Sequence, residues 1–289
     1  MRVGTSRVLA DDVLELAPAA SGATNANLIC KPVGKLKESG AADRSLPPRV
    51  DGDRVLVDFG TLTPGTWALR WAEPGGMERP ILTTDPCYDT ALAEEYASRA
   101  RTHAFGVVRT ATGRLRVRVR AVRPHAEVRT VRTTDEQVAV GGFLAYTAEP
   151  AAGADVELVV RSRHREGDEE QRYPARLTGR TFTAEIPLRP LAEAHDLGRD
   201  HNEWDLWLRI PGLDTELRLG SHVDDIVGKK GRLSFLRTAI GTGAGAIGMS
   251  PYYTVKDGLS ILGVAVTDTS DDRADEAADD TGDALGEAA

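Results

Sequence analysis

The sequence predicts an all-β protein made of two tandem immunoglobulin-like β-sandwich domains, followed by a disordered acidic C-terminal tail. Three observations support this prediction. Apolar and polar residues alternate with a period of two through most of the chain, as expected for half-buried strands. Short turns rich in Gly and Pro separate these segments, which is typical of sandwiches. One strand-and-turn pattern also occurs twice.

The repeated pattern consists of a glycine, alternating apolar residues, a tryptophan and a Pro-Gly turn. Its first copy is Gly52, Val55, Val57, Phe59, Trp67, Leu69 and Pro74-Gly75, and its second copy is Gly179, Phe182, Ala184, Ile186, Trp204, Leu206 and Pro211-Gly212. A duplicated module favours a scaffold or binding surface over an enzyme with one catalytic cleft. Chance similarity between two unrelated β domains is the alternative.

Residues 1–123 are expected to form the first domain. The alternation predicts strands at 8–16, 27–31, 54–59, 66–71 and 114–122. Apolar residues recur at helical spacing after Asp89 and Thr90, either of which is a suitable N-cap. We therefore expect one short helix near 89–101. The segment 123–125, Arg-Pro-His, breaks the strand pattern and marks the boundary to the second domain.

Residues 125–266 are expected to form the second domain. Extended segments are predicted at 128–140, 143–147, 155–161, 173–177, 181–186, 204–210, 216–219 and 259–266. The net charge of −8 is concentrated beyond them, because residues 267–289 hold nine acidic residues and one arginine. This composition predicts a disordered acidic tail. The remaining chain is close to neutral, so we expect no nucleic-acid partner.

The sequence also indicates a compartment. No stretch approaches the roughly 18–20 apolar residues of a membrane helix, so no transmembrane segment is expected. Residues 1–7 lack the apolar run of a secretory signal. We therefore expect a cytoplasmic protein, in which Cys30 and Cys87 are reduced thiols rather than a disulfide.

Catalytic motifs are absent from the sequence. It contains no GxSxG elbow, P-loop, CxxC or HExxH motif. The segment 243–248 formally matches the dinucleotide fingerprint, but Pro251 follows too closely for the required helix. We therefore expect no cofactor and predict no catalytic residue.

The predicted strand 114–122 carries a row of arginines on one face. Arg114, Arg116, Arg118 and Arg120 alternate with apolar residues. Guanidinium groups match phosphates and carboxylates, which makes this row a candidate binding surface. The other interpretation is an exposed strand that its charges protect from edge pairing.

Two further groups are candidate binding residues. Trp204 and Trp207 serve as sugar-stacking platforms if they are exposed, or pack over the core if they are buried. His195 and His201 lie in a polar stretch that ends at Glu203. Mixed His and carboxylate side chains bind zinc, but this spacing fits no compact motif, so we predict no metal site.

The segment 251–261, Pro-Tyr-Tyr-Thr-Val-Lys-Asp-Gly-Leu-Ser-Ile, resembles the end of β-rich accessory regions in actinobacterial glycosyltransferases of the CDP-glycerol glycerophosphotransferase type. The segments 204–209 and 217–220 are similar to the same regions. This resemblance covers mainly residues 125–266 and implies a non-catalytic accessory module of teichoic-acid-like glycopolymer synthesis. It implies a glycan or a transferase as the partner. A transferase that uses a nucleotide-activated donor, with its pocket at residues 195–203, is the alternative.

Overall fold

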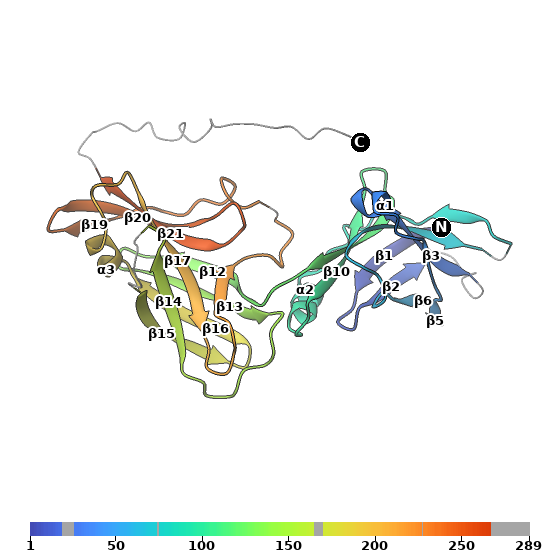
Figure 1. Cartoon of the computed structure of the whole chain (residues 1–289), viewed down its shortest axis with the longest axis horizontal. Helices are drawn as coiled ribbons and strands as arrows, with labels where there is room; N and C mark the ends of the chain where they lie inside the picture. The colour runs from blue at the N-terminus through green and yellow to red at the C-terminus, as the bar shows by residue number, and fades with distance from the viewer. Residues whose placement is uncertain (19–25, 74, 165–169, 227, 267–289) are drawn as a thin grey trace.

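The computed structural model describes residues 1–18, 26–73, 75–164, 170–226 and 228–266 (Figure 1). These residues form 21 strands and three short helices, α1 (Lys35–Glu38), α2 (Thr90–Ala97) and α3 (Leu188–Glu193). The prediction of an all-β protein is therefore confirmed. The predicted disordered tail, residues 267–289, lies outside the described residues. No helix in the described ranges is long and apolar enough to cross a membrane.

The strands of residues 2–121 form two sheets around one core. The first sheet has the order β5 (Arg49–Asp51), β6 (Arg54–Asp58), β2 (Val13–Pro18), β1 (Arg2–Val8) and β9 (Leu82–Thr83). The second has the order β10 (His103–Arg109), β11 (Leu115–Ala121), β7 (Gly65–Ala72), β3 (Asn27–Val33) and β4 (Arg44–Leu46), with β8 (Glu78–Pro80) also paired to β7. Buried side chains of both sheets, such as Leu14 and Trp67, share one hydrophobic cluster. Cys30 and Cys87 are both free thiols.

The strands from His125 onward form a single sheet of ten strands. Its order is β14 (Val156–Ser162), β15 (Glu170–Thr178), β16 (Thr181–Pro187), β13 (Gln137–Ala145), β12 (His125–Thr133), β18 (Leu217–Gly220), β17 (Asn202–Arg209), β21 (Leu259–Val266), β20 (Gly245–Tyr253) and β19 (Thr238–Thr242). β14 pairs with β15 at one edge and with β17 at the other. This second pairing closes seven strands, from β14 round to β17, into a barrel.

The barrel differs from the expected immunoglobulin-like sandwich, in which the strands belong to two separate sheets. The cause is the contact between β14 and β17, which extends over six residue pairs from Glu157–Arg209 to Ser162–Trp204. Such a ring leaves its seven strands on one continuous surface. The strands β21, β20 and β19 continue from β17 beyond the ring, as an extension of the same sheet.

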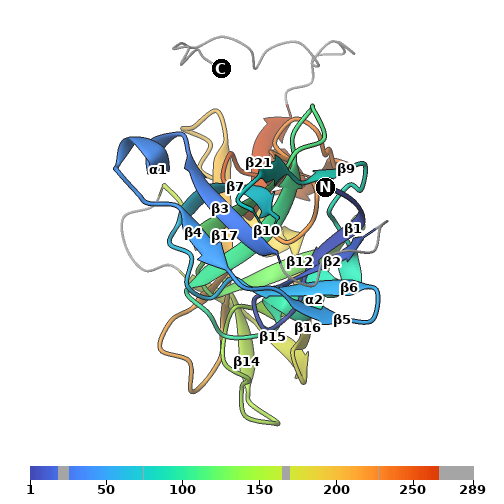
Figure 2. The same ribbon diagram turned by 90° about the vertical axis from the view of Figure 1, so that its right-hand side faces the viewer.

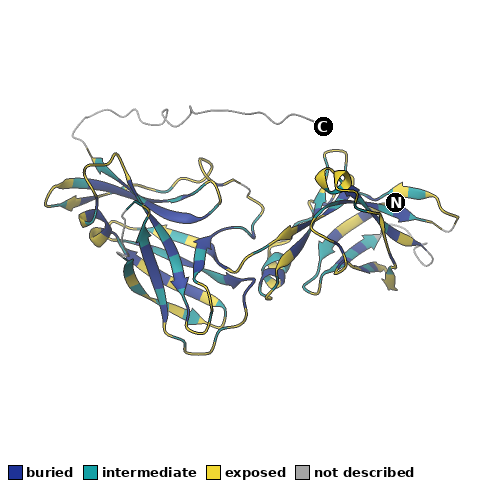
Figure 3. Ribbon diagram, in the orientation of Figure 1, coloured by how far each residue is buried: buried dark blue, intermediate teal, exposed yellow. Residues whose placement is uncertain are grey.

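Side chains that point into the barrel form its core. Phe182, Leu158, Val160, Leu206 and Leu208 are fully buried there, and Figure 3 shows buried positions alternating with more exposed ones along these strands. This alternation follows from the opposite directions of successive side chains in a strand. It explains why period-two patterns in the sequence identify most of the barrel strands.

The repeated sequence pattern corresponds to a similar local structure in both halves from its glycine to its tryptophan, and Pro74 of its first copy lies outside the described residues. Gly52 turns the chain between β5 and β6 with φ 59°, and Gly179 turns it between β15 and β16 with φ 57°. Glycine adopts this left-handed conformation without steric cost. Trp67 and Trp204 then enter their cores, with 1% and 3% of their surface exposed. The likeness is local, because the sheets around the two copies connect differently.

Helix α2 lies between the two groups of strands, in the segment where the sequence predicts a helix. Its cap is Asp89, whose Oδ1 accepts a hydrogen bond from the Leu92 amide at 3.0 Å. The Ala97 carbonyl accepts a hydrogen bond of 2.7 Å from the amide of Tyr146, the residue directly after β13. Figure 2 looks along the molecule with the strands of residues 2–121 in front of the barrel. A second contact joins the halves at the end of β11, where Arg120 Nη2 donates to the His222 carbonyl.

The close contact of β12 with β13 generates a stability prediction. A β-bulge interrupts their register between Val128 and Thr130, and a Cβ on Gly142 would lie 1.8 Å from the Glu127 carbonyl oxygen. We expect Gly142→Ala to lower the free energy of unfolding by about 1–3 kcal/mol or more, because the backbone must move. Urea unfolding measures the change. Gly106→Ala is the control, since a Cβ there meets no atom within 4 Å; equal losses in both variants would contradict this packing.

Candidate functional site

Strand β17 presents polar and aromatic side chains on the outer surface of the barrel. Its residues alternate strictly between buried and half-buried positions. The outward side chains are those of Glu203, Asp205, Trp207 and Arg209, whereas Trp204, Leu206 and Leu208 point into the core. The neighbouring strands β14, β18 and β21 add side chains to the same outer surface, so a continuous polar wall forms over β17.

Asp205 is the centre of this wall. Its Oδ1 lies 2.6 Å from Arg163 Nη2 and 2.8 Å from Arg218 Nη2, and it accepts a hydrogen bond of 2.8 Å from the Ser260 hydroxyl. Burial alone raises the pKa of Asp205, but the hydrogen bond from Arg163 and the charge of Arg218 outweigh burial and lower the pKa. Asp205 is therefore an ionised group that positions two arginines.

Glu203, near the start of β17, is also held by ion pairs and hydrogen bonds. Its Oε2 lies 2.6 Å from Arg163 Nη1 and 3.2 Å from His164 Nε2, while Oε1 accepts a short hydrogen bond from the Tyr252 hydroxyl. Burial and the hydrogen bond to Glu203 raise the pKa of Tyr252 to about 12. Tyr252 is thus a stable hydrogen-bond donor at neutral pH.

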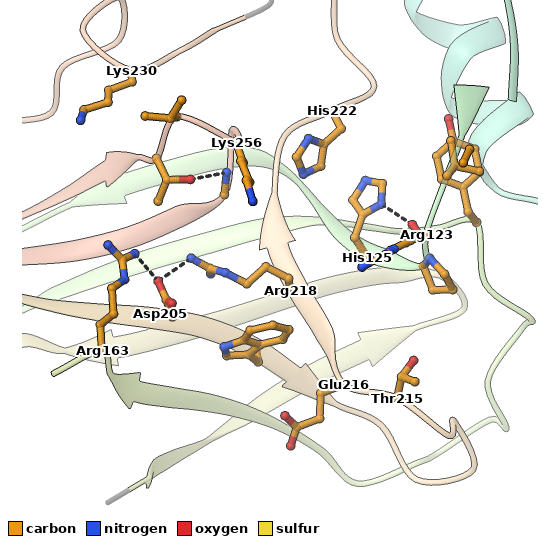
Figure 4. A pocket seen from close by; sticks show the side chains of 18 of the residues that line it. Arg123, His125, Arg163, Asp205, Thr215, Glu216, Arg218, His222, Lys230 and Lys256 are labelled. Atoms are coloured by element: carbon orange, nitrogen blue, oxygen red, sulfur yellow. Dashed lines mark hydrogen bonds and ion pairs between the residues drawn. The ribbon is translucent and has the colours of Figure 1, made fainter. Parts of the chain in front are cut away.

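A pocket of about 1090 Å³ opens over this wall (Figure 4). It is also lined by the turn between β20 and β21, the loop after β18 and the segment that joins β11 to β12. Three lining residues are Asp or Glu, and six are Arg or Lys: Arg120, Arg123, Arg163, Arg218, Lys230 and Lys256. Positive charge is therefore in excess, and the pocket is suited to an anionic ligand.

Three of these cations are available to a ligand. Arg123, Lys230 and Lys256 are exposed, and none of them takes part in an ion pair within the described ranges. Figure 4 places Lys230 and Lys256 on one side of Arg218 and Arg123 on another. Arginine and lysine differ in geometry but both bind phosphates, arginine through a fork and lysine as a point charge.

Trp207 supplies the aromatic surface of the pocket. The centre of its half-buried ring lies 5.8 Å from the guanidinium carbon of Arg161 and 5.4 Å from that of Arg218. Such cation–π contacts fix the orientation of the ring. Glu216 lines the same pocket and is held by Arg161 at 2.6 Å and Arg209 at 2.5 Å.

The loop after β18, which lines another side of the pocket, is held in place by a buried carboxylate. Glu127 is completely buried on β12; its Oε2 accepts the His222 amide at 2.8 Å and lies 2.9 Å from His125 Nε2, and its Oε1 accepts the Val223 amide at 3.0 Å. Burial alone raises the pKa of Glu127, but the hydrogen bonds from His125 and the His222 amide lower it overall. The loop is therefore tied to the barrel by a charge-assisted network.

Lys229 holds the same loop from within. Only 1% of its surface is exposed, and its Nζ donates to the Ser221 carbonyl at 2.9 Å, the Ile226 carbonyl at 2.6 Å and Asp224 Oδ1 at 2.7 Å. All three protons of the ammonium group are thus satisfied. The adjacent Lys230 is exposed and lines the pocket. Two neighbouring lysines therefore have different roles, one structural and one available to a ligand.

The arginine row, which begins just before β11 and continues along it, lies mostly outside the pocket. Arg114 and Arg118 are exposed and Arg116 is half-buried, and only Arg120 lines the pocket. Arg120 Nη2 donates to the His222 carbonyl at 3.3 Å. The four residues enter no ion pair among the described residues. The row therefore runs from open surface toward the pocket and does not form a site by itself.

The other predicted residues are also divided. Trp204 is buried in the barrel core, whereas Trp207 lines the pocket. His195 is buried, 3.1 Å from Asn202 Nδ2, and does not reach the pocket. His201 is exposed and lies near His164 and Glu203. The structure thus brings Trp207 and Arg120 to one pocket and separates them from Trp204 and His195.

Sequence reasoning did not identify the pocket cations Arg123, Lys230 and Lys256. One signal was present for Arg123, because it lies in the Arg-Pro-His break between the two halves. Lys256 lies in the segment 251–261 that carries the family resemblance, at the turn before β21. No sequence pattern links these residues to one another, since they come from three separate loops.

No protein-family model matches the chain, and no curated protein sequence matches it. Among solved structures, it is similar to a crystal structure of S. aureus TarS 217-571, with 14% identity and a TM-score of 0.37, over 61% of this chain and 50% of that one. A second crystal structure of S. aureus TarS gives 13% identity and a TM-score of 0.37, over 60% and 32% of the two chains.

Pullulanase type I from Bacillus subtilis str. 168, in complex with maltose, gives 10% identity and a TM-score of 0.19, over 75% of this chain and 24% of that one. The chain spans half or less of the length of each of these three structures. TM-scores below 0.5 assign neither a fold nor a function to this chain.

The partly buried position of His222 generates a pH prediction. Burial, and then the nearby His125, lower the pKa of His222 from 6.5 to about 4. As the pH falls from about 6.5 to about 4, the unfolded chain gains a proton that the folded chain does not take up, so the fold loses stability. We expect His222 to contribute a loss on the order of 2–3 kcal/mol across this window.

Urea unfolding at several pH values measures this contribution. In His222→Asn the slope of stability against pH should be smaller than in the wild type. His103→Asn is the control, because His103 is exposed on β10. A slope that His222→Asn leaves unchanged would contradict the assignment.

Proposed function

We propose that this chain is a non-catalytic binding module that holds a phosphate-bearing glycan of cell-surface glycopolymer synthesis. One observation carries the proposal: Arg123, Lys230 and Lys256 line one pocket without acidic partners in the described part of the chain, beside the outward ring of Trp207. The cations suit phosphate groups, and the face of an indole ring suits the apolar face of a sugar or polyol.

The state of the pocket carboxylates favours binding over catalysis. Asp205 is held by Arg163 and Arg218, Glu203 by Arg163 and Tyr252, and Glu216 by two arginines outside the pocket. A general base needs a pKa near the working pH. The pKa values of all three carboxylates are lowered instead, so these groups act as fixed counter-charges that position arginines.

The resemblance of the segment 251–261 to accessory regions of glycosyltransferases and glycerophosphotransferases supports the ligand class. On this proposal the chain works in the cytoplasm beside such a transferase. Its two domains are residues 1–123 and 125–266, and they meet at the pocket, because residues 120–125 form part of its lining. The ligand site is therefore assigned to the second domain together with the segment that precedes it.

Binding of a defined glycerol phosphate oligomer, measured by isothermal titration calorimetry, tests the proposal. We expect the triple variant Arg123→Ser/Lys230→Ser/Lys256→Ser to bind at least tenfold more weakly, because three unpaired charges are lost from the pocket. Added salt should also weaken binding to the wild type. The control is Arg114→Ser/Lys35→Ser/Lys37→Ser, which removes the same charges from exposed positions away from the pocket.

The control variant is expected to keep its affinity within twofold. Equal losses in both triple variants would mean that only the total charge matters, and the pocket proposal would then be wrong. An uncharged oligosaccharide serves as a second probe. If it binds as tightly as the phosphate oligomer, the stated ligand class is wrong.

The alternative is a transferase that uses a nucleotide-activated donor. We expect incubation with CDP-glycerol and an acceptor to leave the donor intact, as followed by mass spectrometry, since each pocket carboxylate is held in ion pairs. A heat-treated sample gives the background. Donor consumption above that background, lost in His195→Ala/His201→Ala, would support the transferase and exclude the proposed role.

A further inference from the structure

We infer that His164, His201 and Glu203 form a site for a divalent transition-metal ion, for which Zn²⁺ is best suited. Each residue offers one ligand atom, and these atoms all lie within 4.8 Å of one another. The site lies at the β17 end of the pocket, since Glu203 lines that pocket. It does not depend on the glycan ligand proposed above.

The barrel closure places these residues together. β14 and β17 run antiparallel, with Ser162 opposite Trp204 as their last pair. The Arg163 amide then donates a hydrogen bond of 2.9 Å to the Glu203 carbonyl, which extends the pairing beyond the end of β14. His164 consequently lies next to the start of β17, beside His201. Residues 39 positions apart in the sequence thus meet at one point.

The distances fit a small ion. His164 Nε2 lies 3.2 Å from Glu203 Oε2, and the rings of His164 and His201 meet edge to face with their centroids 6.3 Å apart. Zinc binds His nitrogens and carboxylate oxygens at about 2.0–2.2 Å, in tetrahedral geometry, so two ligand atoms on one zinc ion lie about 3.3–3.5 Å apart. The separation of 3.2 Å between His164 and Glu203 is already close to this range. His201 is exposed, so its ring can turn toward them.

The surrounding charges permit an ion at this position. Arg163 contacts Glu203 through Nη1 and Asp205 through Nη2, so it keeps the Asp205 partner when Glu203 turns to a metal. Tyr252 donates to Oε1 of Glu203, whereas Oε2 faces both His164 and Arg163 Nη1, so a metal ion at Oε2 takes the place of Arg163. Two imidazoles and one carboxylate favour zinc over magnesium or calcium, which prefer oxygen ligands. Three protein ligands also leave a coordination position open.

Calorimetry of the tag-free full chain with Zn²⁺, and separately with Mg²⁺, tests this site. We expect Zn²⁺ to bind with one site that Mg²⁺ does not occupy. His164→Asn and His201→Asn should each weaken Zn²⁺ binding at least tenfold, because each removes a ligand. His103→Asn is the matched control, since His103 is exposed on β10 in the other half of the chain, and it should bind as the wild type does.

Co²⁺ is a spectroscopic probe of the same site, because its visible ligand-field bands report nitrogen coordination. The bands should appear with the wild type and with His103→Asn and be lost in His201→Asn. Because the His201 side chain is exposed, we expect this variant to fold normally. Zn²⁺ binding no tighter than Mg²⁺ binding would overturn the inference, since acidic residues such as those in 267–289 bind both ions. Unchanged Zn²⁺ binding in both ligand variants would overturn it as well.

Discussion

The pairing of β14 with β17 is the contact on which the rest of the C-terminal half depends. It converts a row of strands into a ring and removes two edges that would otherwise expose unpaired backbone groups. It also fixes the direction of every side chain on β17, because a strand whose two neighbours are set has no freedom of register. The positions of Asp205 and Trp207 on the outer surface follow directly from this pairing.

The polar wall over β17 is organised by charges whose burial is costly. Arg218 is largely withdrawn from water, and burial lowers its pKa, so the attraction of Asp205 mainly offsets the cost of desolvation. Arg218 Nη1 also donates to the Leu206 and Leu259 carbonyls at 2.7 and 2.6 Å. Such a network adds little net stability. Its effect is to hold guanidinium groups in fixed directions before any ligand arrives.

The sequence allowed the strands to be predicted better than the way in which they join. Alternation identified β11, β16 and β17, because a half-buried strand imposes a period of two on its residues. The same rule could have separated Trp204 from Trp207, which are three positions apart and so lie on opposite sides of β17. Barrel closure was not predictable, since local patterns carry no information about which strand pairs with β14.

The candidate site was less predictable for the same reason. Lys229 and Lys230 are adjacent and identical in the sequence, yet one is buried and the other exposed. The difference arises from the carbonyls of Ser221 and Ile226, which only the folded loop brings to Lys229. Likewise, the proximity of His164 to His201 depends on strands distant in the sequence. Contacts of this kind come from tertiary structure and not from spacing.

The pocket is lined both by Arg120, at the end of β11, and by Lys256, at the turn between β20 and β21. A molecule that fills it therefore touches both halves beside residues 122–124, where the described part of the chain passes from one half to the other. Its affinity must depend on the angle between the halves, and by thermodynamic reciprocity its binding must shift the distribution of that angle by the same free energy. Ligand binding to the pocket and the angle between the halves at residues 122–124 are therefore thermodynamically coupled.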